Sequence, residues 1–173
     1  MVLYQDETTF FRQPTQASLW GIRGRVQPRL PWSHRSNTRL RVVSYLDAVT
    51  GAVHSQDMPV VSADRLAKSV ARISTLYPHA ETISLVWDNW PNHAHALVEQ
   101  ALRTQNRVRV LWLPTYAPWL NPIEKLWRWT RQRVSHAHPW CDDFAEFRDQ
   151  IRTEMLTLAH GSVDLLKYVG LSR

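Results

Sequence analysis

Residues 82–89, with the sequence TISLVWDN, decide the expected fold because they are almost continuously apolar up to Asp88. A run of this length is typical of a central parallel strand that helices cover on both faces. Helical spacing of apolar residues precedes it over residues 62–77, and helical and strand patterns follow at residues 94–101 and 108–113. This alternation predicts strand–helix–strand units with right-handed parallel crossovers.

Three further strand patterns lie upstream at residues 2–9, 39–46 and 52–56, and a turn through Gly51 joins the last two. Residues 14–36 hold three prolines, two glycines and two tryptophans, which predicts a long irregular basic loop. Downstream, we expect one helix capped by Asn121, with Pro122 as its first residue, and a last helix over residues 144–158. The whole chain, residues 1–173, is predicted to be a single α/β domain with a mixed five-stranded sheet.

Positive charge is concentrated in two blocks of a chain that has 21 Lys and Arg, 15 Asp and Glu, and a net charge of +6. No acid separates Glu7 from Asp47, yet seven arginines lie between them, and residues 101–140 hold seven cations against one acid, Glu124. One guanidinium group can donate to two oxygens of the same phosphate, so the pattern predicts a nucleic-acid partner. The alternative is a solvated basic surface without a partner. The arginines expected to contact DNA phosphates are Arg23, Arg25 and Arg29 in the loop, and Arg128 and Arg131 beside Glu124.

Several protein classes are excluded by composition. Cys141 is the lone cysteine, so neither an internal disulfide nor a paired-cysteine metal site is possible. No apolar run reaches the 18 or so residues of a membrane span, and residues 1–10 lack the pattern of a signal peptide. We therefore expect a protein of the cytoplasm that acts on chromosomal or plasmid DNA.

Three carboxylates stand where local structure alone does not require an acid. Asp6 lies late in the first strand, Asp88 ends the fourth, and Glu124 falls in the first turn of the helix after the fifth. If the first and fourth strands are neighbours, both aspartates emerge near one sheet edge, where the helix brings the glutamate over them. Carboxylate oxygens suit Mg²⁺ or Mn²⁺, and two such ions can support phosphodiester cleavage.

Each acid also has a purely structural interpretation. Glu124 stands three residues after Asn121, the offset of a capping box, and four before Arg128, the offset of a surface ion pair. Asp88 can serve an ordinary strand-to-turn exit, and Asp6 a solvated strand end. Only the joint placement of the three acids favours catalysis.

The segments around these acids resemble those of DDE transposases, and more narrowly the catalytic domain of the bacterial insertion sequence 630 family within the mariner superfamily. The matching segments are YQDE at residues 4–7, TG at 50–51, VWDN at 86–89 with His93, LPTYAP at 113–118 and LNPIE at 120–124. The last is the most specific, and the resemblance extends to about His138. The 35 residues between Asp88 and Glu124 are close to the spacing typical of this family.

This resemblance implies a ribonuclease H-like fold, metal-dependent cleavage of DNA at transposon ends, and transfer of the freed strand to target DNA. It implies that Asp6, Asp88 and Glu124 bind two Mg²⁺ ions, for which Mn²⁺ substitutes, and that Asn89 and His93 support these ligands or contact DNA. It also implies a homodimer in the active complex. Helix-turn-helix modules precede the first catalytic strand in this family and are absent here, so we expect either a fragment or a partner of a separate N-terminal DNA-reading chain.

Other functions stay open at this point. The chain fits a non-catalytic nucleic-acid-binding or assembly subunit derived from a transposase, or a general ribonuclease H-like nuclease. Two His-x-His pairs admit zinc binding, although an offset of two residues places side chains on different faces of a helix. Those histidines are His93, His95, His136 and His138.

The nine tryptophans are divided between the core and a nucleic-acid surface. Trp87, Trp112 and Trp127 are expected in the core because they follow apolar strand and helix patterns. Exposed indole rings beside cations suit base stacking. The candidates for that role are Trp20, Trp32, Trp119 and Trp129.

Overall fold

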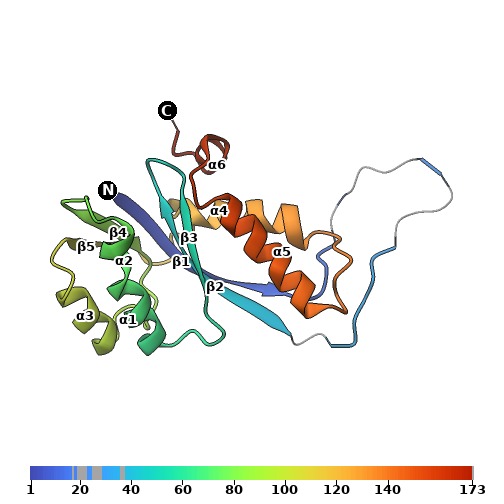
Figure 1. Cartoon of the computed structure of the whole chain (residues 1–173), viewed down its shortest axis with the longest axis horizontal. Coiled ribbons are helices and arrows are strands. Elements are labelled where there is room, and N and C mark those ends of the chain that lie inside the picture. Colours follow the sequence, from blue (N-terminus) through green and yellow to red (C-terminus); the bar gives the residue numbers. More distant parts are fainter. Residues whose placement is uncertain (17, 19–22, 25–28, 36–37, 173) are drawn as a thin grey trace.

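Five strands form one mixed sheet in the order β3-β2-β1-β4-β5 in the computed structural model, which describes residues 1–16, 18, 23–24, 29–35 and 38–172 (Figure 1). β1 pairs antiparallel with β2, and β2 with β3, whereas β4 lies parallel to β1 and to β5. The predicted mixed sheet is therefore confirmed. The strands are β1 (Val2–Phe11), β2 (Arg39–Asp47), β3 (Val53–Asp57), β4 (Ile83–Trp87) and β5 (Val108–Trp112).

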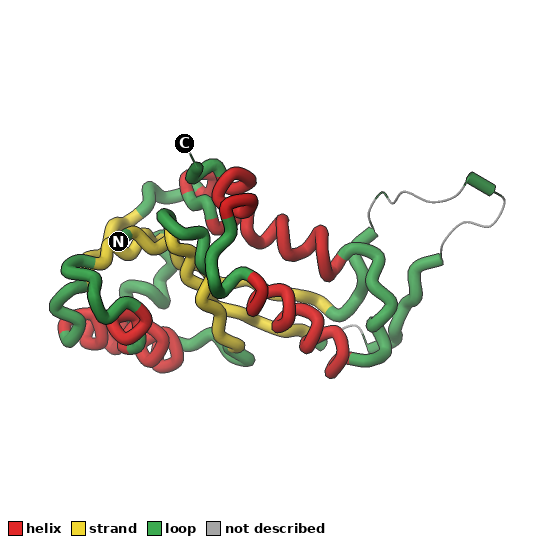
Figure 2. The backbone as a smooth tube through the Cα atoms, turned by 45° about the horizontal axis from the view of Figure 1, so that its top comes forward, coloured by secondary structure: helices red, strands yellow, loops and turns green. Residues whose placement is uncertain are grey.

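Helices cover both faces of this sheet (Figure 2). They are α1 (Ala63–Ala71), α2 (Ile73–Leu76), α3 (Ala96–Arg103), α4 (Ile123–Thr130), α5 (Phe144–Thr157) and α6 (Val163–Val169), with a 3-10 turn η1 (Pro118–Leu120) and a π-helical stretch η2 (Arg131–Ser135). Ser62 caps α1, and the single helix expected over residues 62–77 is divided at Arg72. Among the described residues, no helix has the length and apolar character needed to cross a membrane.

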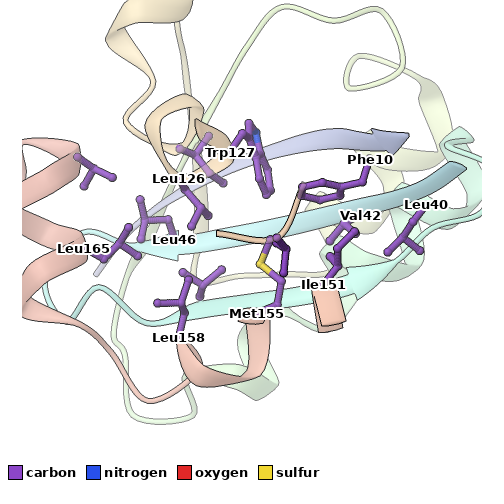
Figure 3. Packing of buried hydrophobic residues seen from close by; sticks show 14 of the residues in the cluster. Phe10, Leu40, Val42, Leu46, Leu126, Trp127, Ile151, Met155, Leu158 and Leu165 are labelled. Carbon is purple, nitrogen blue, oxygen red and sulfur yellow. The ribbon is translucent and has the colours of Figure 1, made fainter. Parts of the chain in front are cut away.

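Alternate side chains of β1 enter two separate cores. Leu3 packs with the residues of α1 and α3, whereas Phe10 packs with those of α4, α5 and α6 (Figure 3). Trp127 of α4 and Phe147 of α5 are both buried in the second core. Each side chain of this size contributes about 1.5–3 kcal/mol through burial, and the two cores hold β1 at the centre of the molecule.

The start of α4 differs from the prediction by one residue. Pro122 occupies the cap and Ile123 begins the helix. Asn121 still serves this end, because its Oδ1 accepts a hydrogen bond from the Ile123 amide at 3.4 Å. A capping box would require the backbone N–H of Asn121 to donate to the side chain of Glu124. This N–H donates instead to the carbonyl oxygen of Pro118 at 2.9 Å, so the capping box that was a structural alternative for Glu124 is not formed.

Two tryptophan predictions are wrong. Trp112 is 47 % exposed, because β5 is an edge strand with no further strand beside it in the described part of the chain. Trp129 was expected to face DNA but is half-buried, with its ring 5.0 Å from that of Tyr168 and packed against the second core. Trp32 and Trp119 are exposed as predicted, and Trp20 lies outside the described residues.

Candidate active site

The order of the strands brings two of the three predicted acids together. β1 and β4 are parallel neighbours, with Tyr4 paired to Val86. Asp6 and Asp88 each follow this pair by two residues, so they stand level at the same end of the sheet. The expectation that the first and fourth strands are neighbours is confirmed.

Asp6 points to the face of the sheet that α4 covers. The indole Nε1 of Trp127 donates a hydrogen bond of 2.8 Å to its carboxylate. Burial raises the pKa of Asp6 to about 7, the Trp127 bond opposes this rise, and the charges of Glu7 and Glu124 add to it. The free carboxyl is thus close to half-protonated near neutral pH, and a nearby cation would favour its charged form.

Glu124 lies on the exposed side of the first turn of α4. Partial burial raises its pKa, the Asp88 charge also raises it, and Arg131 lowers it. Within the described part of the chain, Glu124 makes no ion pair with Arg128, so the surface pair that was a structural alternative for this acid is not formed. Glu124 instead shares the electrostatic environment of the two aspartates, since its charge also acts on Asp6.

His93 links Asp88 to a fourth acid. Its Nδ1 lies 2.8 Å from Oδ1 of Asp88, and its Nε2 lies 3.2 Å from Oε1 of Glu7. The ring is 1 % exposed and stacks on Trp87 with 4.3 Å between ring centroids. Burial opposes the charge on His93, but the bonds to Asp88 and Glu7 outweigh it and raise the pKa of His93 to about 9.

Glu7 was not among the predicted site residues. It lies on the opposite face of β1 from Asp6, where Leu3 is part of the apolar core. No sequence signal distinguishes Glu7, because its face of β1 also carries the polar side chains of Gln5 and Thr9. The structure supplies the partner, because protonated His93 donates to Glu7 and Asp88 together and so holds positive charge between them.

Asn89 has a different role from His93. Its side-chain amide donates to the carbonyl oxygen of Leu113 at 2.7 Å and to Oγ1 of Thr115 at 3.3 Å. These bonds attach the segment after β5 to the end of β4, directly beside Asp88.

A basic pocket of about 570 Å³ adjoins Glu124. Arg131 is half-buried in it and donates to Oγ1 of Thr8 at 2.5 Å, with its guanidinium 5.7 Å from the centre of the Phe10 ring. The lining residues are Pro118, Trp119, Asn121, Glu124, Lys125, Arg128, Arg131 and His136.

The predicted DNA-contacting arginines are distributed over two regions. Arg128 is exposed beside the pocket, and Arg131 lies deeper. Arg23 and Arg29 are exposed in the basic loop, and Arg25 lies outside the described residues. Not every cation of the basic blocks is available to a ligand.

Arg107 illustrates this limit, because its guanidinium donates to four carbonyl oxygens at the end of α2 and in the following turn. Arg12 is buried and donates to the carbonyl oxygen of Cys141. The linear charge count therefore overstates the basic surface.

The zinc alternative is wrong. His95 caps α3 by accepting the Leu97 amide at 3.2 Å, and His138 is buried between Trp140 and Phe147. His93 is held between two carboxylates. The histidines therefore do not converge on one zinc position. Among the described residues, no three His, Cys, Asp or Glu side chains surround a common metal position, and this includes Asp6, Asp88 and Glu124 in their present orientations.

The carboxylates suit a hard divalent cation by their chemistry, since Mg²⁺ and Mn²⁺ prefer oxygen ligands. In the structure, the Asp6 carboxylate accepts a hydrogen bond from Trp127. The Asp88 carboxylate is bonded to His93 and accepts a hydrogen bond from the backbone N–H of Trp90. The charge of Glu124 raises the pKa of Asp6, and the charge of Asp88 raises the pKa of Glu124, so Glu124 lies close enough to both aspartates for like charges to repel. A cation at this edge would offset that repulsion.

Asp6 lies in the middle of β1 and not late in the strand as expected, but it is level with Asp88, which directly follows the adjacent parallel strand β4. This mixed sheet, with a third acid on the helix after the edge strand, defines a ribonuclease H-like fold, which solved transposase structures share. The chain belongs to the DDE superfamily endonucleases, whose family model matches residues 1–148. The resemblance inferred from the sequence motifs is therefore confirmed.

A relative from Shigella sonnei, the insertion element IS630 uncharacterized 39 kDa protein, is 25 % identical over 158 residues. The match covers 91 % of this chain and 45 % of the relative, so the chain spans less than half the length of that protein.

Solved structures of Mos1 transposase share the fold. The paired-end complex with the left transposon end aligns with a TM-score of 0.70 at 16 % identity, covering 98 % of this chain and 51 % of that one. The Mos1 strand transfer complex has a TM-score of 0.70 at 17 % identity over 98 % of this chain and 50 % of that one. The Mos1 catalytic domain alone gives 0.61 at 15 % identity, with coverage of 98 % and 74 %.

Proposed function

We propose that this chain is the catalytic domain of a transposase, which cleaves DNA phosphodiester bonds at transposon ends and joins the freed strand to target DNA. The observation that carries the proposal is the level placement of Asp6 and Asp88 at adjacent strands, with Glu124 near both: its charge raises the pKa of Asp6, and the charge of Asp88 raises the pKa of Glu124. Membership of the DDE endonucleases and the structural likeness to a strand transfer complex support it.

Asp6, Asp88 and Glu124 would bind the divalent ions, with Mg²⁺ as the cofactor, Mn²⁺ as its substitute, and two ions per site. When bound, such ions supply activation of the attacking oxygen and stabilisation of the leaving oxygen. Solved Mos1 complexes with Mg and with Mn have the same fold, which supports this choice of metal.

The chain's own residues orient Asp6 and Asp88 and supply positive charge near Glu124. Trp127 donates to Asp6 and fixes one carboxylate oxygen. His93 does the same for Asp88 and is itself held by Glu7. Arg131 supplies positive charge near Asp6 and Glu124 and limits their repulsion before a metal binds.

Arg128 and Lys125 are exposed cations that line the pocket, and Arg23 and Arg29 are exposed in the loop. These side chains would bind DNA phosphates, together with Arg25. We infer that residues 1–173 act as one catalytic domain within a homodimer that pairs two DNA ends. End recognition would belong to helix-turn-helix modules of the same protein or of a separate N-terminal chain.

The test is nicking of supercoiled plasmid by the purified chain. We expect nicking in 5 mM or so Mg²⁺ or Mn²⁺ and its loss on chelation with EDTA, because the acids need the ion to act on a phosphodiester. DNA binding that persists in EDTA without any nicking in either metal would favour the alternative of a non-catalytic nucleic-acid-binding subunit.

Glu7 is bonded to His93, which in turn is bonded to Asp88. Replacing Glu7 is therefore expected to lower activity through Asp88, without any contact between Glu7 and DNA. We expect Glu7→Gln to weaken Mg²⁺-dependent nicking by about 10- to 100-fold, since groups that orient metal ligands have effects of this size. The matched change Glu99→Gln, on the exposed surface of α3, is expected to leave the rate unchanged.

The measurement is the nicking rate as a function of Mg²⁺ concentration. A positioning role requires that the half-saturating Mg²⁺ concentration rise in Glu7→Gln and that His93→Gln show the same rise. If the Mg²⁺ dependence is unchanged while the melting temperature falls, the bridge is structural only.

A further inference from the structure

Residues 113–121, here named the β5–α4 loop, are attached at both ends to the candidate active site. Near its start, Asn89 donates to Leu113 and Thr115, next to Asp88. At its end, the side-chain amide of Asn121 donates to the carbonyl oxygen of Gln5 at 3.5 Å, next to Asp6. The loop therefore runs between the two aspartates and Glu124.

Two aromatic rings on this attached loop face solvent. Tyr116 is 90 % exposed and Trp119 is 76 % exposed, although Ala117 between them is buried. Tyr116 also has a φ of +59°, a left-handed conformation that is unfavourable for a residue other than glycine. Neither ring serves the core, and strained backbone of this kind concentrates at functional sites.

Charge around the rings points to a nucleotide ligand. Trp119 lines the same pocket as Glu124, Arg128 and Arg131. Proteins that bind single-stranded nucleic acid combine a cationic groove for the backbone with aromatic rings on which bases stack. In a regular duplex the faces of internal bases are covered by their neighbours, so a protein ring reaches them only when a nucleotide leaves the stack.

We propose that Trp119 and Tyr116 stack on unpaired bases beside the phosphate held by Asp6, Asp88 and Glu124, so that the site takes DNA with locally opened base pairs. The choice of DNA as ligand rests on the proposed function. The attached loop fixes the distance between the rings and the acids, which makes the two aromatic residues determinants of which phosphate is attacked.

The test compares two oligonucleotide duplexes of the same sequence, one fully paired and one with a forked end that carries 2-aminopurine at the first unpaired position. Binding is measured in Ca²⁺, so that affinity is separated from cleavage. We expect the chain to bind the fork about tenfold more tightly than the paired duplex and to quench the 2-aminopurine fluorescence, because stacking on an aromatic ring favours an unpaired base.

Variants of Trp119 test whether its ring causes the fork preference and the quenching. Trp119→Ala should remove the preference for the fork and the quenching while leaving affinity for the paired duplex within about twofold, and Trp119→Phe should retain most of both. Leu156→Ala, at a residue that is 68 % exposed on α5, is the surface control and should behave as the unmodified chain.

Equal affinity for fork and duplex, absence of quenching, or equal weakening of both by Trp119→Ala would overturn the proposal. Glu124→Gln separates it from the proposed function, since this variant should lose nicking and keep the quenching. Quenching and fork preference without nicking in any metal would contradict the catalytic proposal and support the stacking surface alone.

Discussion

Replacing Asp88 with Asn, or Glu124 with Gln, is expected to lower Mg²⁺-dependent DNA nicking at least about a thousandfold, which corresponds to about 4 kcal/mol in the activation barrier. Both changes keep the size of the side chain and remove the charge that would bind the cation. Glu124 is exposed and makes no ion pair in the described part of the chain, so Glu124→Gln should alter the free energy of unfolding by less than about 0.5 kcal/mol. Asp88→Asn removes a charged partner of the buried His93, so a loss of stability of about 1–3 kcal/mol is expected beside the loss of nicking. The measurements are the nicking rate of supercoiled plasmid and unfolding in urea.

Glu81→Gln is the matched control, because Glu81 is an exposed acid just before β4 and outside the acidic site. It should nick DNA at the rate of the unmodified chain. Nicking by Asp88→Asn or Glu124→Gln within tenfold of that rate would exclude the replaced carboxylate as a ligand.

Gly51→Ala is expected to reduce the free energy of unfolding by about 3 kcal/mol, since a left-handed conformation alone costs about 1–2 kcal/mol in an alanine. Gly51 has a φ of +71° in the turn between β2 and β3. A Cβ there would lie 2.5 Å from the backbone oxygen of Ser162, the residue that caps α6. The added carbon must therefore displace backbone and loosen the attachment of α6.

Val49→Ala provides the comparison, because Val49 lies in the same turn and its side chain is 70 % exposed. Urea unfolding should separate the two variants clearly, with Val49→Ala within about 0.5 kcal/mol of the unmodified chain. Similar stability for both would mean that the turn and α6 shift apart at little cost.

Local patterns predicted the elements of the sheet to within two residues. Period-two alternation indicated β1, and the continuous apolar run indicated β4. Both signals are local, because successive side chains of a strand point to opposite faces of the sheet. The helix α6 was missed, since its seven residues carry too short a pattern. The exposure of Trp112 was also missed, because an edge strand and a central strand can have the same apolar sequence.

The three acids were found from the sequence, but their surroundings were not. The indole of Trp127 was assigned only to the core, whereas it also donates to Asp6, 121 residues away along the chain. Glu7 gave no sign of its bond to His93, which joins residues 86 positions apart. Such pairs depend on the strand register and on the placement of helices, which no local pattern encodes.

The sequence by itself determined all five strands and most of the helices, which faces are apolar, and that acids lie in the first strand and directly after the fourth in a DDE endonuclease. Only the tertiary structure decided that β1 lies between β2 and β4, which sets Asp6 level with Asp88 and places His93 between two acids. The physical reason is that periodicity arises from neighbouring residues, whereas strand order and side-chain partners follow from packing the whole chain around two cores.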